Sequence, residues 1–256
     1  MSISIKHLCL ALGGSHAYGL STPASDKDYR GVFQHLELDK VLGINRFEHL
    51  ETKNNEEDKF LFELRHFLCL ARKTNTTVME LLFTDSFVRK TPEWELIQMH
   101  RAELIDSERF YKSLKGYVFG ERRLMIGERT GQLGGKRKNA IDQFGYSPKN
   151  AVQLLRLSWC GKVFFQTGIF PVFLSKWNNE FAQDLLDIKV NPQKYTGAQM
   201  NEESLRYEEI LDKAFAQRTI HFEFNEEAAN QLIFEISWPV LKELRKNSLD
   251  FWTKHI

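Results

Sequence analysis

The order of apolar and polar positions separates a beginning rich in strands from a longer helical remainder. An apolar run over residues 4–12 stops at Gly13 and Gly14, which is typical of a buried strand that enters a tight turn. Shorter apolar runs at residues 28–34 and 59–62 predict two further strands. The first sixty residues therefore indicate a small sheet.

Apolar residues recur at helical spacing from residue 62 onward, first over residues 62–73 and then over residues 76–83. Residues that commonly cap a helix N-terminus recur along the rest of the chain, and two of them precede a proline. The expected caps are Thr91, Ser147, Asn201 and Asn225. The helix that starts at Ser147 is expected to end at Gly168.

The composition changes near Thr91, and the pattern as a whole predicts an α+β fold. We expect a domain with a small mixed β-sheet at residues 1–90, followed by an α-helical domain at residues 91–256. The second domain is expected to contribute contacts to a nucleotide or an acceptor. A chain of 256 residues is long enough for two domains of modest size.

Composition and charge narrow the class of protein. Hydrophobic residues make up 42% of the chain, and the formal net charge is +1. No bulk basic field marks a nucleic-acid-binding protein, so any such contact must come from local patches. Cys9, Cys69 and Cys160 are scattered among apolar residues, which favours reduced thiols in the cytoplasm over a disulfide framework. The apolar run near the N-terminus is too short to span a membrane.

Two short motifs carry the candidate chemistry. Gly14 and Ser15 follow the first strand, where backbone N–H groups and a hydroxyl can bind phosphate; an ordinary strand-to-helix turn is the alternative. Asp26 and Asp28 alternate on a strand, so their carboxylates share a face and repel each other. A divalent cation relieves that repulsion, and oxygen ligands favour Mg²⁺. A solvated turn would also explain these aspartates.

Together, the two motifs suit phosphoryl transfer from a nucleoside triphosphate. Their order resembles that of nucleotidyltransferases of the DNA polymerase beta superfamily, and more narrowly the stand-alone bacterial and phage enzymes of the YcgL type. The resemblance covers the first third of the chain and a second block at residues 145–172. It implies that Gly14 and Ser15 bind the triphosphate and that Asp26 and Asp28 bind Mg²⁺, with Mn²⁺ as the alternative.

A third acid completes the metal site in that superfamily. The resemblance favours Asp58, at the start of the third predicted strand, and Glu57 is the alternative. Glu63 is expected inside the next helix in a solvated role. The alternative without a functional role is that residues 54–59 form a solvated loop.

The second block adds two candidate nucleotide-binding residues. Lys149, Gln153 and Arg156 recur at intervals of four and three on one helix face, where Lys149 and Arg156 are expected to bind the triphosphate. Pairing of both cations with surface acids is the alternative. The chain has Ser147 and Gln153 where the family commonly has aspartate and histidine, so an acid or base role at these positions is open.

The glycine-rich basic stretch at residues 127–139 does not fit the P-loop pattern. It is interpreted either as a flexible surface loop or as a mobile basic lid over a polyanion.

The sequence thus predicts a cytoplasmic, magnesium-dependent nucleotidyltransferase that moves a nucleoside monophosphate, from ATP or another triphosphate, to an acceptor hydroxyl. RNA 3′ ends, proteins and small molecules are all open as acceptors, and no membrane partner is expected. The alternatives are a non-catalytic nucleotide-binding or antitoxin-like protein on the same fold, and a helical interaction protein.

Overall fold

The computed structural model of the chain describes residues 4–42, 48–53, 57–128 and 134–255. By packing, the described chain forms two compact units, which are treated separately below. The first consists of residues 1–17, 23–106 and 222–256, and the second of residues 18–22 and 107–221. The division into domains at residue 90 stays a prediction, although the compact units themselves divide the chain after Asp106.

The first unit contains a five-stranded mixed sheet in the order β3-β4-β2-β1-β5. The strands are β1 (Ile5–Gly13), β2 (Lys27–His35), β3 (His49–Lys53), β4 (Glu57–Glu63) and β5 (Phe87–Lys90). β2 and β4 pair in parallel, and the other neighbouring strands pair antiparallel. This sheet, with helices before and after its later strands, confirms the predicted α+β class.

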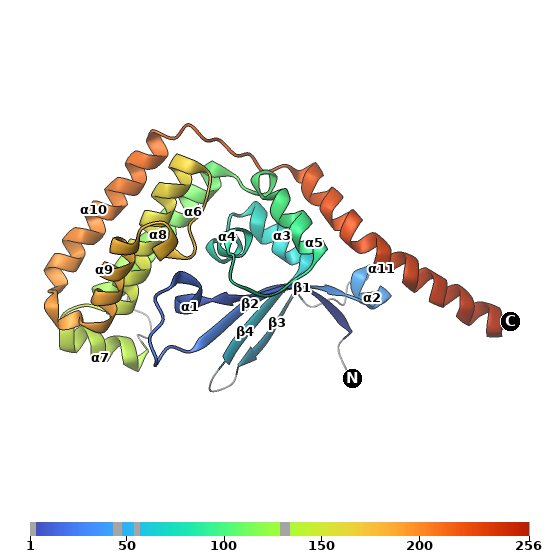
Figure 1. The fold of residues 1–256 in the computed structure, drawn as a ribbon, viewed down its shortest axis with the longest axis horizontal. Helices are drawn as coiled ribbons and strands as arrows, with labels where there is room; N and C mark the ends of the chain where they lie inside the picture. Colours follow the sequence, from blue (N-terminus) through green and yellow to red (C-terminus); the bar gives the residue numbers. More distant parts are fainter. Residues whose placement is uncertain (1–3, 43–47, 54–56, 129–133, 256) are drawn as a thin grey trace. The chain divides into compact units, whose positions relative to one another are not determined.

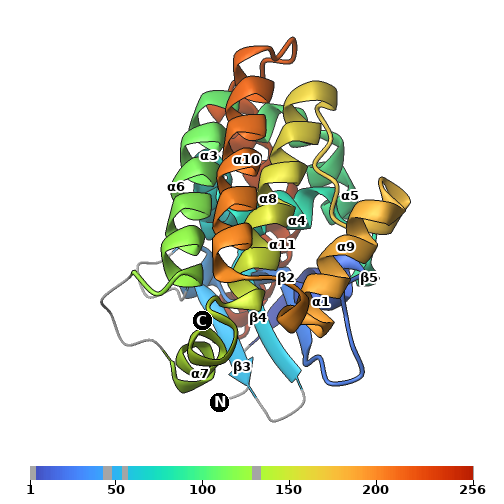
Figure 2. The ribbon, with the colours of Figure 1, turned by 90° about the vertical axis from the view of Figure 1, so that its left-hand side faces the viewer.

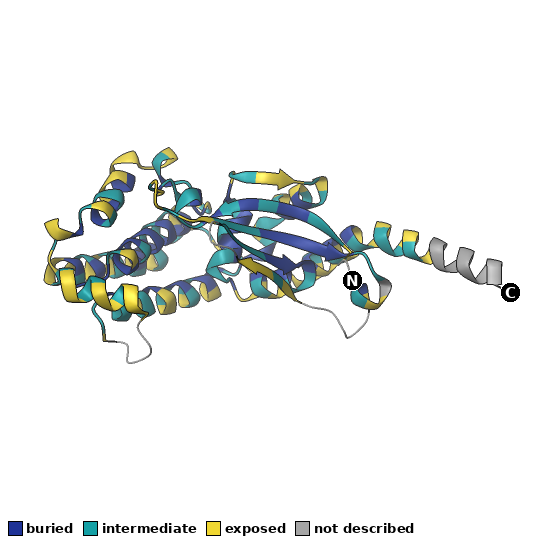
Figure 3. Cartoon of the chain, turned by 90° about the horizontal axis from the view of Figure 1, so that it is seen from below, coloured by how far each residue is buried: buried dark blue, intermediate teal, exposed yellow. Residues whose placement is uncertain are grey.

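Three helices lie on one side of the sheet: α3 (Leu64–Arg72), α4 (Thr76–Phe83) and α5 (Pro92–Met99) (Figure 1). Phe67 and Trp94 are fully buried there, with their rings edge to face at 5.3 Å, an arrangement that aromatic pairs prefer. The short helices α2 (Leu38–Val41) and η1 (Arg101–Leu104) and the long helix α11 (Glu226–His255) complete this unit. Buried residues follow the central strands, and exposed residues lie on the edge strands as well as on the helices (Figure 3).

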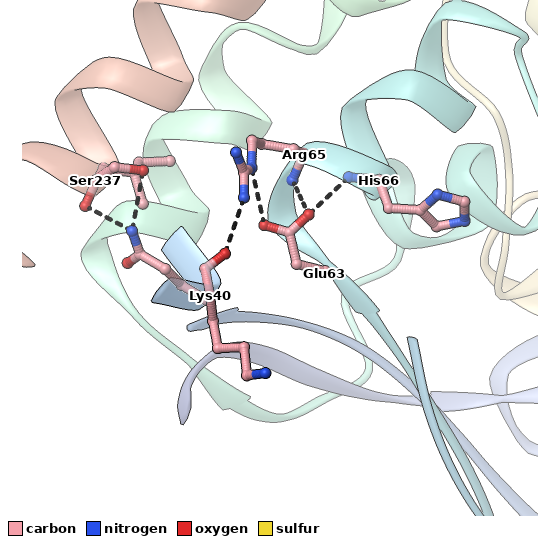
Figure 4. A network of polar contacts seen from close by, with 7 residues as sticks. Lys40, Glu63, Arg65, His66 and Ser237 are labelled. Carbon is pink, nitrogen blue, oxygen red and sulfur yellow. Dashed lines mark hydrogen bonds and ion pairs between the residues drawn. The ribbon is translucent and has the colours of Figure 1, made fainter. Parts of the chain in front are cut away.

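Glu63 shows how the chain turns from β4 into α3. Its carboxylate accepts hydrogen bonds from the backbone N–H groups of Arg65 and His66, at 2.9 and 3.0 Å, and so caps α3 (Figure 4). Arg65 also donates to the backbone oxygen of Lys40 at 3.2 Å. The expectation of a solvated Glu63 inside the helix is therefore wrong, because the side chain is 3% exposed and satisfies the helix N-terminus.

The second unit is helical. Its elements are α6 (Ser107–Met125), α7 (Gly135–Phe144), α8 (Pro148–Thr167), η2 (Leu174–Lys176), α9 (Asn179–Val190), η3 (Pro192–Lys194) and α10 (Gly197–Ala216). α8 packs against α6, α9 and α10, and Figure 2 shows α6, α10 and α8 side by side. The central position of α8 explains why most of its residues are buried. Within the described residues, no helix combines the length and the apolar character needed to cross a membrane.

Most predicted helix ends are confirmed. Thr91 caps α5, α8 begins at Pro148, and Gly168 ends α8 in the left-handed conformation. Asn225 accepts from the N–H of Ala228 at 3.1 Å at the start of α11.

Two expectations need correction. Asn201 lies inside α10 rather than at its start, because the helix is capped at Thr196, five residues earlier, where Thr196 forms a capping box with Gln199. The basic stretch at residues 127–139 is not a loop throughout, since Gly135 begins α7. Residues 129–133 of this stretch lie outside the described residues.

Candidate active site

The parallel pairing of β2 and β4 brings two of the predicted acids together. The register sets Asp28 directly opposite Asp58. Residues opposite each other on neighbouring strands point to the same face of a sheet, so these two carboxylates belong to one surface. Both are about one-quarter exposed, at 29% and 26%, so each is accessible to a ligand.

Asp26 lies immediately before β2 and is exposed. It precedes Asp28 by two residues, the spacing that puts alternate side chains on one side of an extended segment. Asp28 and Asp58 each have a cation nearby. Arg30 Nη2 lies 3.9 Å from Asp28 Oδ1, and Lys53 Nζ lies 3.9 Å from Asp58 Oδ2. These cations offset part of the repulsion between the carboxylates.

The glycine turn meets the carboxylates at Asp28. Gly13 pairs with Asp28 across β1 and β2, and Gly14 follows with a φ of +55°. A Cβ atom built on Gly14 would overlap Oδ2 of Asp28. Glycine is therefore required here both by its positive φ and by the closeness of the carboxylate. Ser15 is the next residue of α1 (Gly14–Tyr18), so the two predicted motifs are neighbours in the folded chain.

Glu57, the alternative third acid, faces away from Asp28. It pairs in register with Lys27, one position before Asp28 and Asp58, and therefore lies on the opposite face of the sheet. Lys59 Nζ lies 2.8 Å from Glu57 Oε2, and this hydrogen bond holds the pKa of Glu57 below its ordinary value. The register thus groups Asp58, rather than Glu57, with Asp28.

The donor set suits a hard cation in kind, since Asp26, Asp28 and Asp58 supply only carboxylate oxygens. Among the residues that the structure describes, however, no three His, Cys, Asp or Glu side chains are gathered closely enough to hold a metal ion. A cation shared by these three aspartates would therefore require their side chains to come closer together. The three residues suit Mg²⁺ by their chemistry, and the register brings Asp28 and Asp58 together, but the side-chain rotamers would have to change.

The two predicted nucleotide-binding residues of the second block differ in exposure. Lys149, in the first turn of α8, is exposed. Arg156 is fully buried; its guanidinium lies 3.6 Å from the centre of the Tyr18 ring. Its Nε and Nη2 atoms donate to Oε1 of Gln153 at 3.3 and 3.2 Å. Arg156 and Gln153 thus interact with each other, and Arg156 also contacts Tyr18, the last residue of α1.

Sequence reasoning missed a second cation that contacts residues 18–22. Lys189, near the end of α9, donates to the backbone oxygen of Leu20 at 2.7 Å. Burial lowers the pKa of Lys189, and the charge of Lys149 lowers it further. No local pattern distinguishes Lys189 from the other lysines of the chain, since its partner Leu20 is distant in sequence.

Comparison with known families shows to which class of protein this pairing of a glycine turn with aspartates belongs. Residues 2–158 match the family model RlaP, described as the RNA repair pathway DNA polymerase beta family. The chain belongs to this family. The match includes the Gly14 turn, the aspartates of β2 and β4, and the first half of α8. Membership of the RlaP family confirms the resemblance to the polymerase beta superfamily and supports a general role in nucleotidyl transfer.

A phage protein is similar to part of this RlaP family chain. An "Uncharacterized 38.9 kDa protein in nrdC-mobD intergenic region" of Enterobacteria phage T4 is 34% identical over 122 residues. The match covers 41% of the chain and 34% of the phage protein. The chain therefore spans about a third of the length of this relative.

Proposed function

We propose that the chain is a magnesium-dependent nucleotidyltransferase that moves a nucleoside monophosphate from a nucleoside triphosphate to a hydroxyl at an RNA end. The new bond joins the acceptor oxygen to the α-phosphorus, the bond between the α-phosphorus and the bridging oxygen breaks, and pyrophosphate leaves. The RlaP description as an RNA repair pathway family supports an RNA acceptor over a protein or a small molecule.

One observation carries the proposal. Asp28 lies opposite Asp58 in the β2–β4 register and also against Gly14, where a Cβ would overlap its carboxylate. A glycine turn followed by a hydroxyl side chain therefore adjoins a pair of carboxylates, the combination that two-metal transfer of a nucleotide uses.

In the proposed reaction, Asp26, Asp28 and Asp58 hold the metal, and Asp58 helps to deprotonate the attacking hydroxyl. Gly14 and Ser15 bind the β- and γ-phosphates through the backbone and the hydroxyl. When bound, Mg²⁺ supplies charge neutralisation at the reacting phosphate and favours ionisation of the acceptor hydroxyl. Lys149 is proposed to offer a further positive charge to the phosphates.

A labelling experiment tests the proposal. Purified protein is incubated with Mg²⁺, total RNA and each α-³²P-labelled nucleoside triphosphate in turn. We expect label on RNA with the wild type and none with Asp28→Asn, whose side chain keeps its size but loses its charge. Label that needs neither Mg²⁺ nor Asp28, or no label with any triphosphate, would contradict the proposal.

A non-catalytic nucleotide-binding protein is the second candidate. The ion pairs of Asp28 with Arg30 and of Asp58 with Lys53 favour it, because they already offset the charge that a metal would neutralise. This candidate predicts Mg²⁺-independent binding of triphosphate without transfer. Calorimetry with and without Mg²⁺, beside the labelling experiment, separates the two candidates.

A further inference from the structure

The second unit contains an open pocket between α8, α9 and α10, with a volume of about 230 Å³. Its aromatic lining residues are Trp159 of α8, Phe181 of α9 and Tyr207 of α10. The pocket is smaller than the roughly 300–1,000 Å³ typical of sites for drug-sized ligands. It therefore suits a single flat ring or one side chain rather than a whole nucleotide.

The aromatic residues form a continuous stack along one wall. The rings of Trp159 and Phe181 lie 4.9 Å apart at 30°, and those of Phe181 and Tyr207 lie 5.8 Å apart at 19°. Phe181 is 7% exposed, whereas Trp159 and Tyr207, the two ends of the stack, are half-buried and therefore partly accessible. A stack whose end rings are accessible can accept a further π system.

The remaining lining residues supply hydrogen-bond donors and acceptors. Glu180 and Asp184 contribute carboxylate acceptors, and Lys162 contributes an ammonium donor. Burial, as the main cause, raises the pKa of Tyr207, and the positive charge of Arg206 opposes part of this effect. A tyrosine hydroxyl is protonated at neutral pH and can donate a hydrogen bond.

The charges argue against a phosphate inside the pocket. Arg206 lies 4.9 Å from the centre of the Tyr207 ring but is already paired with Glu203 through both of its carboxylate oxygens. The positive charge of Lys162 then faces the carboxylates of Glu180 and Asp184. This balance favours a neutral ring with polar edges over an anion.

We infer that this pocket binds one unpaired base of a single-stranded RNA by stacking on the Trp159–Phe181–Tyr207 wall, with its edge hydrogen-bonded to the polar rim. Single-stranded RNA is commonly bound by stacking of its bases on aromatic side chains and by hydrogen bonds to their edges. The carboxylates favour bases that carry an exocyclic amine, such as adenine and cytosine. The inference rests on the proposed RNA acceptor and adds a contact on the second unit.

The test measures RNA binding alone, without triphosphate or Mg²⁺, so that it does not depend on transfer. Fluorescein-labelled hexamers of adenylate, cytidylate and uridylate, and a hexamer with abasic nucleotides, are titrated with the full chain and followed by anisotropy. The variants are Tyr207→Leu and Asp184→Asn. Tyr117→Leu is the matched control, because Tyr117 is a 41% exposed aromatic residue of α6 that does not line the pocket.

We expect the wild type to bind the base-carrying hexamers more tightly than the abasic one. Tyr207→Leu should weaken binding to them by about 5- to 150-fold, the effect of losing one base stack, and leave abasic binding unchanged. Asp184→Asn keeps an exposed side chain of the same size, and should weaken binding to adenylate and cytidylate more than to uridylate. Tyr117→Leu should bind as the wild type does.

Equal binding of abasic and base-carrying hexamers would overturn the inference, as would unchanged binding by Tyr207→Leu. Binding of an arginine-rich peptide that depends on Asp184, with no dependence on bases, would assign the pocket to a cationic partner instead. If RNA binds as expected but receives no label, the pocket inference stands and the proposed transfer fails. If label is transferred to RNA while Tyr207→Leu binds RNA as the wild type does, the proposed transfer stands and the pocket inference fails.

Discussion

Replacing Gly14 with alanine tests the candidate site where the glycine turn meets the carboxylate. Gly14 has a φ of +55°, and a residue with a Cβ atom adopts this conformation at a cost of about 1–2 kcal/mol. A cost of this size should lower the melting temperature of the chain by about 2–8 °C. The added Cβ atom would also overlap Oδ2 of Asp28 and lie 3.1 Å from its Cγ, so the carboxylate must turn away.

The effect on activity should be much larger than the effect on stability. A displacement of about 1 Å at a reacting group costs on the order of 100-fold in rate, so Gly14→Ala should reduce labelling of RNA by about that factor. Gly127→Ala is the matched control: its φ is +78°, but the nearest atom to an added Cβ is 3.5 Å away, at ordinary contact distance. Thermal unfolding by circular dichroism and the labelling rate are measured for both variants. Gly14→Ala with more than half of wild-type activity, or an equal loss of activity in Gly127→Ala, would refute the reasoning.

Three further predictions follow from other contacts. Asp58→Asn should abolish labelling while Glu57→Gln leaves it within twofold of the wild type, since Glu57 lies on the other face of the sheet; the opposite result would exchange their roles. Arg156→Lys keeps a positive charge but loses the planar guanidinium that stacks on Tyr18 and bonds to Gln153. Chemical denaturation should therefore show a loss of about 2–4 kcal/mol in the free energy of unfolding. An unchanged free energy of unfolding would contradict a stabilising role for these contacts. The ammonium of Lys194 and two further hydrogen bonds hold the pKa of Asp187 at about 2, below its ordinary 3.8. This carboxylate should stabilise the fold above about pH 4 and lose that effect as the pH falls towards 2, and Asp187→Asn should remove this part of the acid dependence.

The strands that the sequence did not predict share one physical property. β3 and β5 are the two edges of the sheet, and nearly all of their residues are exposed or half-exposed. An edge strand of four or five residues without a buried face carries neither a long apolar run nor a regular alternation. β1, β2 and β4, which form the centre, bury several residues each and were predicted from their apolar runs.

The candidate site could be predicted from the sequence only as far as local spacing determines it. The spacing of Asp26 and Asp28 predicts that their side chains share one side of a single extended segment. The choice between Asp58 and Glu57 depends on the register of β2 against β4, and a shift by one residue would have exchanged them. Glu63 was misassigned for a similar reason, because the end of β4 and the start of α3 fall on adjacent residues and only the cap geometry separates them.

Arg156 shows why spacing on a helix does not determine what a side chain contacts. Its interval from Lys149 predicted a cation directed at phosphate, yet the guanidinium is fully buried against the ring of Tyr18 and bonded to Gln153. A buried cation is costly unless it is stacked and hydrogen-bonded, and the Tyr18 ring and the Gln153 amide oxygen offset part of that cost through the ring face, Nε and Nη2. Arg156 therefore holds the ring of Tyr18, the last residue of the helix that begins at Gly14. A less stable Arg156→Lys variant with unchanged triphosphate affinity would make Arg156 a positioning residue for this segment, whereas a parallel loss of affinity would retain the phosphate role predicted from spacing.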